Sequence, residues 1–178
     1  MSNRLRKITM ATIQNDLITL SVNEAGQIEH LSMKGGPNVI ARPTGLFRAI
    51  LKTGDNWEDV VFADRQKLKV SVSGHSLLIS CDKLRTRDGE RGIALRLTIR
   101  LEEDRLVFES RVSNSSESTL NEWIYPCLGT IDTLSGGKPD LLYPKHLGER
   151  IKHIGDYLKG MTGREALHEI SDSYPGPL

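Results

Sequence analysis

The stretch IALRLTIRL, residues 93–101, places a large apolar residue at every second position. Successive side chains of a β-strand point to opposite faces of a sheet, so this spacing predicts a strand with one face in a core and the other toward water or a polar cavity. A register shift of one residue would move the whole apolar set to the wrong face. The apolar set consists of Ile93, Leu95, Leu97, Ile99 and Leu101.

The same alternation recurs in the segments LKVSV (68–72), SLLISC (76–81) and RLVFESRV (105–112). Turn-forming residues separate these segments, including the run RTRDGERG at 85–92. We therefore expect four strands that follow one another as hairpins. The predicted buried residues include Leu68, Val70, Leu95, Leu97, Ile99 and Phe108, with Lys69, Arg96 and Arg100 on the opposite faces.

Short strands of this kind, bounded by Gly, Asn and Pro, continue through the N-terminal part, and no sustained helical period occurs before about residue 145. This organisation predicts an all-β fold, an antiparallel two-sheet sandwich or supersandwich, rather than alternating βα units. We expect one β-sandwich domain over residues 1–178, with its core at about 10–144. Residues 145–178 are expected to be irregular or briefly helical, and their final loop, SDSYPGPL, suggests a linker to a further domain.

Charge and hydropathy exclude several classes of protein. The 24 basic and 23 acidic residues give a net charge of +1 without a long block of either sign, so the basic footprint of a nucleic-acid binder is missing. No segment approaches the roughly 18 apolar residues of a membrane span, and the N-terminus has no apolar run typical of a signal peptide. We therefore expect a cytoplasmic protein that has neither nucleic acid nor a membrane as its partner.

The candidate binding residues are aromatic residues with polar neighbours. Trp57 stands in GDNWEDVVF beside Asp55 and Glu58, and Trp123 stands in NEWIYPCLG. A sugar ring has an apolar face and a rim of hydroxyls, so an aromatic side chain flanked by carboxylates and amides suits a carbohydrate site. The alternative is structural: Trp57 covers a hairpin edge, and Trp123 packs in the core as an ordinary strand residue.

The loop LLYPKHLGER adds Tyr143 and His146, whose polar neighbours make it the other candidate region. The five histidines are otherwise scattered, no catalytic or nucleotide-binding motif is present, and sequence alone cannot select a pair of carboxylates from the 23 acidic residues. We predict no metal and no cofactor. Cys81 and Cys127 lie among apolar residues outside any CxxC pair, which favours buried free thiols over a disulfide or a metal site.

The order of several segments resembles a known fold family. The segments NDLITLSVNEAGQIEHL, PTGLFRAIL, RLVFESRVSNSSESTLNEWIYPCLG and LLYPKHLGERI together resemble the galactose-mutarotase-like β-supersandwich, over most of residues 10–150. In many glycoside hydrolases this fold is the N-terminal domain and precedes a (β/α) catalytic barrel. The histidine and glutamate that act in aldose epimerases of the same superfamily match no position of this sequence, so no catalytic residue is carried over.

The resemblance implies a non-catalytic N-terminal module of a glycoside hydrolase, packed on a catalytic domain of the same polypeptide. A free-standing carbohydrate-binding module, with Trp57 as its platform, is one alternative. A small enzyme of the aldose-epimerase type is another. If the chain is a fragment, the apolar residues of its C-terminal segment are expected to form an exposed patch or to mediate self-association.

Overall fold

The computed structural model describes residues 10–54, 56–131, 137, 140–143 and 149–153. The chain divides into two compact units, Met1–Thr130 and Ile131–Leu178. Nearly all of the described residues lie in antiparallel β-strands or in the turns between them, and none lies in an α-helix. The predicted all-β, sandwich-like fold is confirmed.

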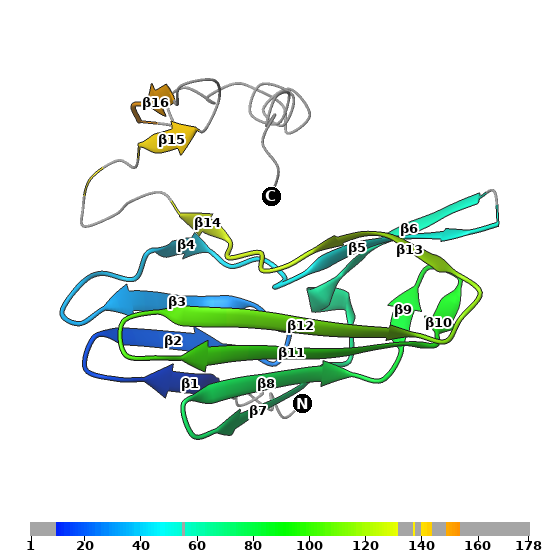
Figure 1. The fold of residues 1–178 in the computed structure, drawn as a ribbon, viewed down its shortest axis with the longest axis horizontal. Helices are drawn as coiled ribbons and strands as arrows, with labels where there is room; N and C mark the ends of the chain where they lie inside the picture. Colours follow the sequence, from blue (N-terminus) through cyan, green and yellow to red (C-terminus); the bar gives the residue numbers. More distant parts are fainter. Residues whose placement is uncertain (1–9, 55, 132–136, 138–139, 144–148, 154–178) are drawn as a thin grey trace, which may run out of the picture. The chain divides into compact units, whose positions relative to one another are not determined.

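Three antiparallel sheets make up most of the first unit (Figure 1). The first is a meander of β1 (Ala11–Gln14), β2 (Ile18–Val22) and β3 (Ile28–Met33). The second has the strand order β12 (Leu106–Asn114), β11 (Ile93–Leu101), β8 (Ser76–Cys81) and β7 (Lys69–Ser73). The third has the order β13 (Thr119–Ile124), β5 (Arg48–Thr53) and β6 (Asn56–Phe62).

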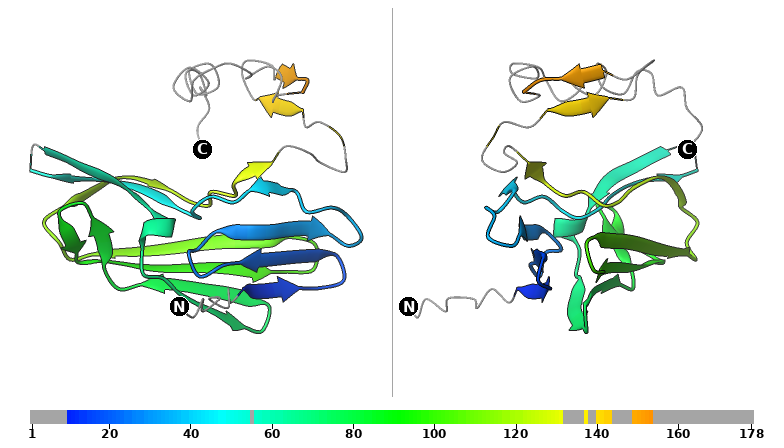
Figure 2. Two further views of the ribbon diagram at one scale, coloured as in Figure 1. Left: turned by 180° about the vertical axis from the view of Figure 1, so that it is seen from behind. Right: turned by 60° about the vertical axis from the view of Figure 1, so that its left-hand side comes forward.

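Several smaller elements lie outside these three sheets. They are β4 (Ile40–Arg42), the 3-10 helix η1 (Ala63–Arg65), the hairpin of β9 (Leu84–Thr86) and β10 (Gly89–Arg91), and β14 (Thr130–Ile131). The β1–β3 meander lies beside the β7–β8 side of the second sheet, which can be followed from both directions in Figure 2. The β9–β10 hairpin occupies the run that the sequence indicates only as a turn, residues 85–92.

The alternation in residues 93–101 predicts β11 correctly. Leu95, Leu97 and Ile99 are buried, whereas Arg96 on the opposite face is exposed. β11 pairs along its whole length with β12 and over six residues with β8, so it is a central strand with neighbours on both sides. Its apolar face belongs to the main core of the first unit, together with Leu77 and Ile79 of β8.

The prediction that Leu68, Val70 and Phe108 are buried is wrong, because all three are only half-buried. Val70 and Phe108 belong to β7 and β12, the two edge strands of the second sheet, and an edge strand has a neighbouring strand on one side only. Leu68 lies just before β7 and packs against the backbone of Gly26 in the turn between β2 and β3. Alternation thus predicts the face of a residue but not how completely that face is covered.

The second unit contains a short antiparallel hairpin of β15 (Leu141–Tyr143) and β16 (Glu149–Ile151). Asp140 accepts hydrogen bonds from the Arg150 guanidinium and from the backbone N–H of His153. These bonds, that of His153 first, lower the pKa of the Asp140 carboxyl. The strand at 149–151 falls in the segment expected to be irregular or helical, and residues 154–178 lie outside the described residues.

Candidate ligand-binding groove

The structure locates only part of the predicted carbohydrate site. Trp57 and Glu58 belong to β6, with Trp57 opposite Lys52 of β5, and Tyr143 belongs to β15, opposite Glu149. Asp55 and His146 lie outside the described residues. The role of these five residues in binding therefore stays a prediction.

Trp123 is half-buried on β13 and belongs to a cluster of aromatic rings. Its ring stacks on Phe47, with 5.0 Å between centroids, and lies 6.4 Å from the ring of Tyr125. Its indole N–H donates a hydrogen bond to the Ser110 hydroxyl on β12, 3.2 Å away. These contacts connect the third sheet to the second, and they favour the packing interpretation of Trp123 over that of an open sugar platform.

Tyr125 completes this cluster. Its ring meets Phe108 edge-on at 6.1 Å, and its hydroxyl donates to the backbone carbonyl oxygen of Thr98 at 3.3 Å. Burial, with a smaller contribution from the negative charge of Glu109, raises the pKa of the Tyr125 phenol well above its usual range. A phenol that stays protonated in this way acts as a hydrogen-bond donor and packing group.

A groove in the first unit offers a better candidate site. Its volume is about 520 Å³, within the range of small-molecule sites, and it lies where the edge strand β6 and the helix η1 approach β9. The strands on its two sides, β6 and β9, belong to different sheets. The lining residues are Val60, Val61, Phe62, Arg65, Gln66, Arg85, Thr86 and Arg87.

The Gln66 side chain fixes the floor of this groove. Its amide N–H groups donate to the backbone carbonyl oxygens of Phe62 at 3.2 Å and Arg85 at 3.1 Å, and its carbonyl oxygen accepts from the backbone N–H of Arg85 at 2.7 Å. Gln66 is buried, with 9% of its surface exposed. One carboxamide therefore holds the middle of β9 against the end of β6, two segments that share no backbone ladder.

Three arginines give the groove a positive rim. Arg65 belongs to η1, directly after β6. Arg85 belongs to β9 and Arg87 follows it, one on each side of the buried Thr86, so both arginines project from the exposed side of that strand. Arg87 pairs with Asp88 at 3.6 Å. Among the side chains that the structure describes, no carboxylate forms an ion pair with Arg65 or Arg85.

Apolar surface accompanies these charges. Val60 and Phe62 lie on the same face of β6, and each has 36% of its surface exposed. The Arg65 guanidinium lies over the Phe62 ring, 5.2 Å from its centroid, which is cation–π geometry. The groove thus combines guanidinium groups, an amide-fixed backbone and an exposed aromatic edge.

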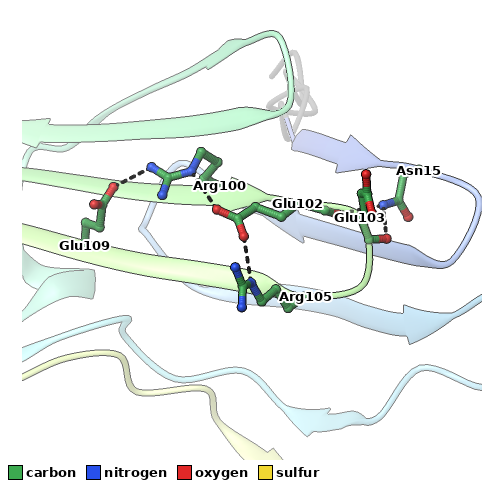
Figure 3. A network of polar contacts seen from close by, with 6 residues as sticks. All are labelled: Asn15, Arg100, Glu102, Glu103, Arg105 and Glu109. Carbon is green, nitrogen blue, oxygen red and sulfur yellow. Dashed lines mark hydrogen bonds and ion pairs between the residues drawn. The ribbon is translucent and has the colours of Figure 1, made fainter.

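A second hollow, of about 350 Å³, is lined by Asn15, His75, Leu101, Glu102 and Glu103. Asn15 donates to the backbone carbonyl oxygens of Glu102 and Glu103, both at 2.9 Å, and ties the β1–β2 turn to the β11–β12 turn. Figure 3 shows these bonds beside a chain of ion pairs. In it, the Glu102 carboxylate accepts from Arg105 at 2.6 Å and from Arg100 at 3.3 Å, and Arg100 also pairs with Glu109 at 2.8 Å.

The hydrogen bond from Arg105, and then that from Arg100, lower the pKa of the Glu102 carboxyl. Its charge is therefore already matched by two guanidinium groups, and the Asn15 side chain is used to connect turns. This hollow is better explained as a braced junction of two hairpins than as a binding site.

Among the described residues, no group of three or more His, Cys, Asp or Glu side chains could hold a metal ion. Both cysteines are free thiols; the predicted burial is confirmed for Cys81, whereas Cys127 is only half-buried. Burial raises the pKa of both thiols. Of the described histidines, His30 is half-buried against the Ser32 hydroxyl, and His75 and His153 are exposed.

Sequence reasoning missed the groove because its residues come from different elements. The signal that could have found it is the pair Arg85 and Arg87, spaced by two around a threonine in a run that otherwise indicates a turn. Such a pair places two guanidinium groups on one side of an extended segment. Neither Arg65 nor Gln66 has a comparable local signal.

Among the described residues, no helix is long and apolar enough to cross a membrane. Comparisons of the chain with protein-family models, with curated proteins and with solved structures give no match. The interpretation of the groove rests accordingly on its own residues and geometry.

Proposed function

We propose that this chain is a non-catalytic carbohydrate-binding β-sandwich module of a glycoside hydrolase, acting beside a catalytic domain of the same polypeptide. The observation that carries the proposal is the composition of the groove at β6, η1 and β9. Its lining combines guanidinium, carboxamide, hydroxyl and apolar groups, which suit the hydroxyls and the C–H face of a sugar.

The same lining is poorly suited to cleaving a glycosidic bond. Hydrolysis commonly needs two carboxyl groups about 5 to 9 Å apart across the sugar, one of them acting as an acid. None of the described residues that line the groove carries a carboxylate or an imidazole. The resemblance to the N-terminal supersandwich of glycoside hydrolases supports the same division of labour, with binding in this chain and catalysis elsewhere.

Two measurements on the full chain test this proposal. Affinity electrophoresis in gels that contain soluble polysaccharides should retard the protein with at least one of them, relative to a gel without polysaccharide. Polarimetry on freshly dissolved glucose and galactose, and assays on a panel of aryl glycosides, should show no rate above that of buffer. Turnover that is abolished by a His75→Ala or His146→Ala substitution would show that the chain is an enzyme. Failure to bind any of the polysaccharides would contradict the proposed binding function.

A further inference from the structure

We propose that the groove at β6, η1 and β9 recognises an acidic sugar, a uronic acid unit, through Arg65 and Arg85. This inference rests on the proposed carbohydrate-binding function and assigns it a ligand class. Its first support is electrostatic. Arg65 and Arg85 line the groove without an ion-pair partner among the described residues, and Arg87 adds a third guanidinium that is matched by Asp88.

Four basic side chains on or beside the outer face of the second sheet, by contrast, are paired with carboxylates. Asp82 bridges Lys69 at 3.0 Å and Arg96 at 3.1 Å, and both Arg100 and Arg105 pair with Glu102. The chain as a whole is almost neutral, with a net charge of +1. Two guanidinium groups without carboxylate partners in one hollow are therefore a local excess of positive charge, which attracts an anion.

The chemistry of arginine favours a carboxylate on a ligand. A guanidinium is planar, stays charged at any physiological pH and can donate two parallel N–H bonds to one carboxylate. Arg65 is held over the Phe62 ring, which restricts its side chain before a ligand arrives. The backbone that carries Arg85 is fixed by two hydrogen bonds to Gln66, so this guanidinium projects from a braced strand.

Size and apolar surface favour a sugar over a small inorganic anion. The hollow of about 520 Å³ is large for one sulfate or phosphate and accommodates roughly one or two sugar rings. Val60 and Phe62 present exposed apolar surface on the same strand, against which the C–H face of a pyranose can pack. A uronic acid combines this apolar face with a carboxylate at the ring edge.

The test uses the full chain, oligogalacturonates and oligoglucuronates, and the methyl esters of the same oligomers as neutral controls. Isothermal titration should give an affinity for the acids about tenfold or more above that for the esters, and this difference should shrink as salt is added. An Arg85→Gln variant, and separately Arg65→Gln, should lose about tenfold in affinity for the acid and almost none for the ester.

Arg111→Gln is the matched control, because Arg111 is exposed on β12 outside the groove and should leave binding unchanged. Thermal unfolding of each variant shows whether it is folded. Retention of full uronate affinity by both folded groove variants would overturn the inference. If esters and acids bind equally, the carbohydrate-binding function survives and the acidic specificity fails. If acetate or sulfate binds through Arg85 as tightly as the uronates, the groove is a plain anion site and both proposals fail there.

Discussion

Tyr125 performs two tasks in one position. Its ring packs against Phe108 and Trp123, and its hydroxyl donates a partly buried hydrogen bond to the Thr98 carbonyl oxygen. The phenol must stay protonated to make this bond, and burial raises its pKa accordingly. The stability of the first unit is therefore linked to pH in the alkaline range.

We predict that this linkage is visible above pH 10. Below the ordinary phenol pKa of about 10, Tyr125 is protonated in both the folded and the unfolded chain, so its contribution to stability is complete. As the pH rises further the unfolded chain ionises first, and the free energy of unfolding falls until the folded-state pKa is reached. Tyr125→Phe should remove this part of the decline, at a cost near neutral pH of about 1 kcal/mol for the lost hydrogen bond.

Denaturant unfolding of both proteins over a series of alkaline pH values measures the effect, and phenolate absorbance gives an independent reading. The absorbance titration of the wild type should contain a phenolate component at high pH, and the Tyr125→Phe variant should lack this component. Parallel stability curves for the two proteins above pH 10 would show that Tyr125 is not buried in the way described.

At the scale of elements, the strongest prediction concerns β11. Leu97→Ala should lower the free energy of unfolding by about 2 to 5 kcal/mol, because it truncates a core side chain of which only 2% is exposed. Leu78→Ala on the adjacent strand β8 is the matched control. Leu78 is 41% exposed on the opposite face of the sheet, and the same truncation there should cost less than about 1 kcal/mol.

Chemical denaturation of both variants gives the comparison directly. Equal losses for the two substitutions, or a loss below 1 kcal/mol for Leu97→Ala, would contradict the assignment of the two faces of this sheet.

The sequence predicts the elements of the second sheet well, because each strand carries its own period-two pattern. Burial at Val70 and Phe108 could not be predicted in the same way, since the strand order, and hence which strands lie at an edge, depends on pairing between distant segments. The groove is harder still to predict from the sequence. Gln66 and Arg85 are 19 residues apart and meet only because the β7–β8 hairpin returns the chain to the end of β6.

At the scale of the molecule, the first unit contains a hydrophobic core of its own. Among the described residues, the buried apolar side chains run from Ile13 to Leu101, within Met1–Thr130. The candidate groove, the aromatic cluster and the braced hairpin junction also lie in this unit. The sequence predicts an exposed apolar patch at six C-terminal residues. Ile151 belongs to β16, whereas Leu147, Ile154, Leu158, Leu167 and Ile170 lie outside the described residues, as does the expected linker at the end of the chain.

We predict that a chain of residues 1–131 folds without the second unit. A group of sheets that contains its own core and its own turns should unfold in one cooperative transition, and its free energy of unfolding should lie within about 2 kcal/mol of that of the full chain. Circular dichroism during urea denaturation tests this. The shorter chain should also keep the uronate affinity of the full protein, because the described residues that line the groove all precede residue 88. A fragment that binds hydrophobic dye and unfolds without cooperativity would show that residues 132–178 complete the core. In that case the chain would have to be treated as one folding unit, as the sequence alone suggests.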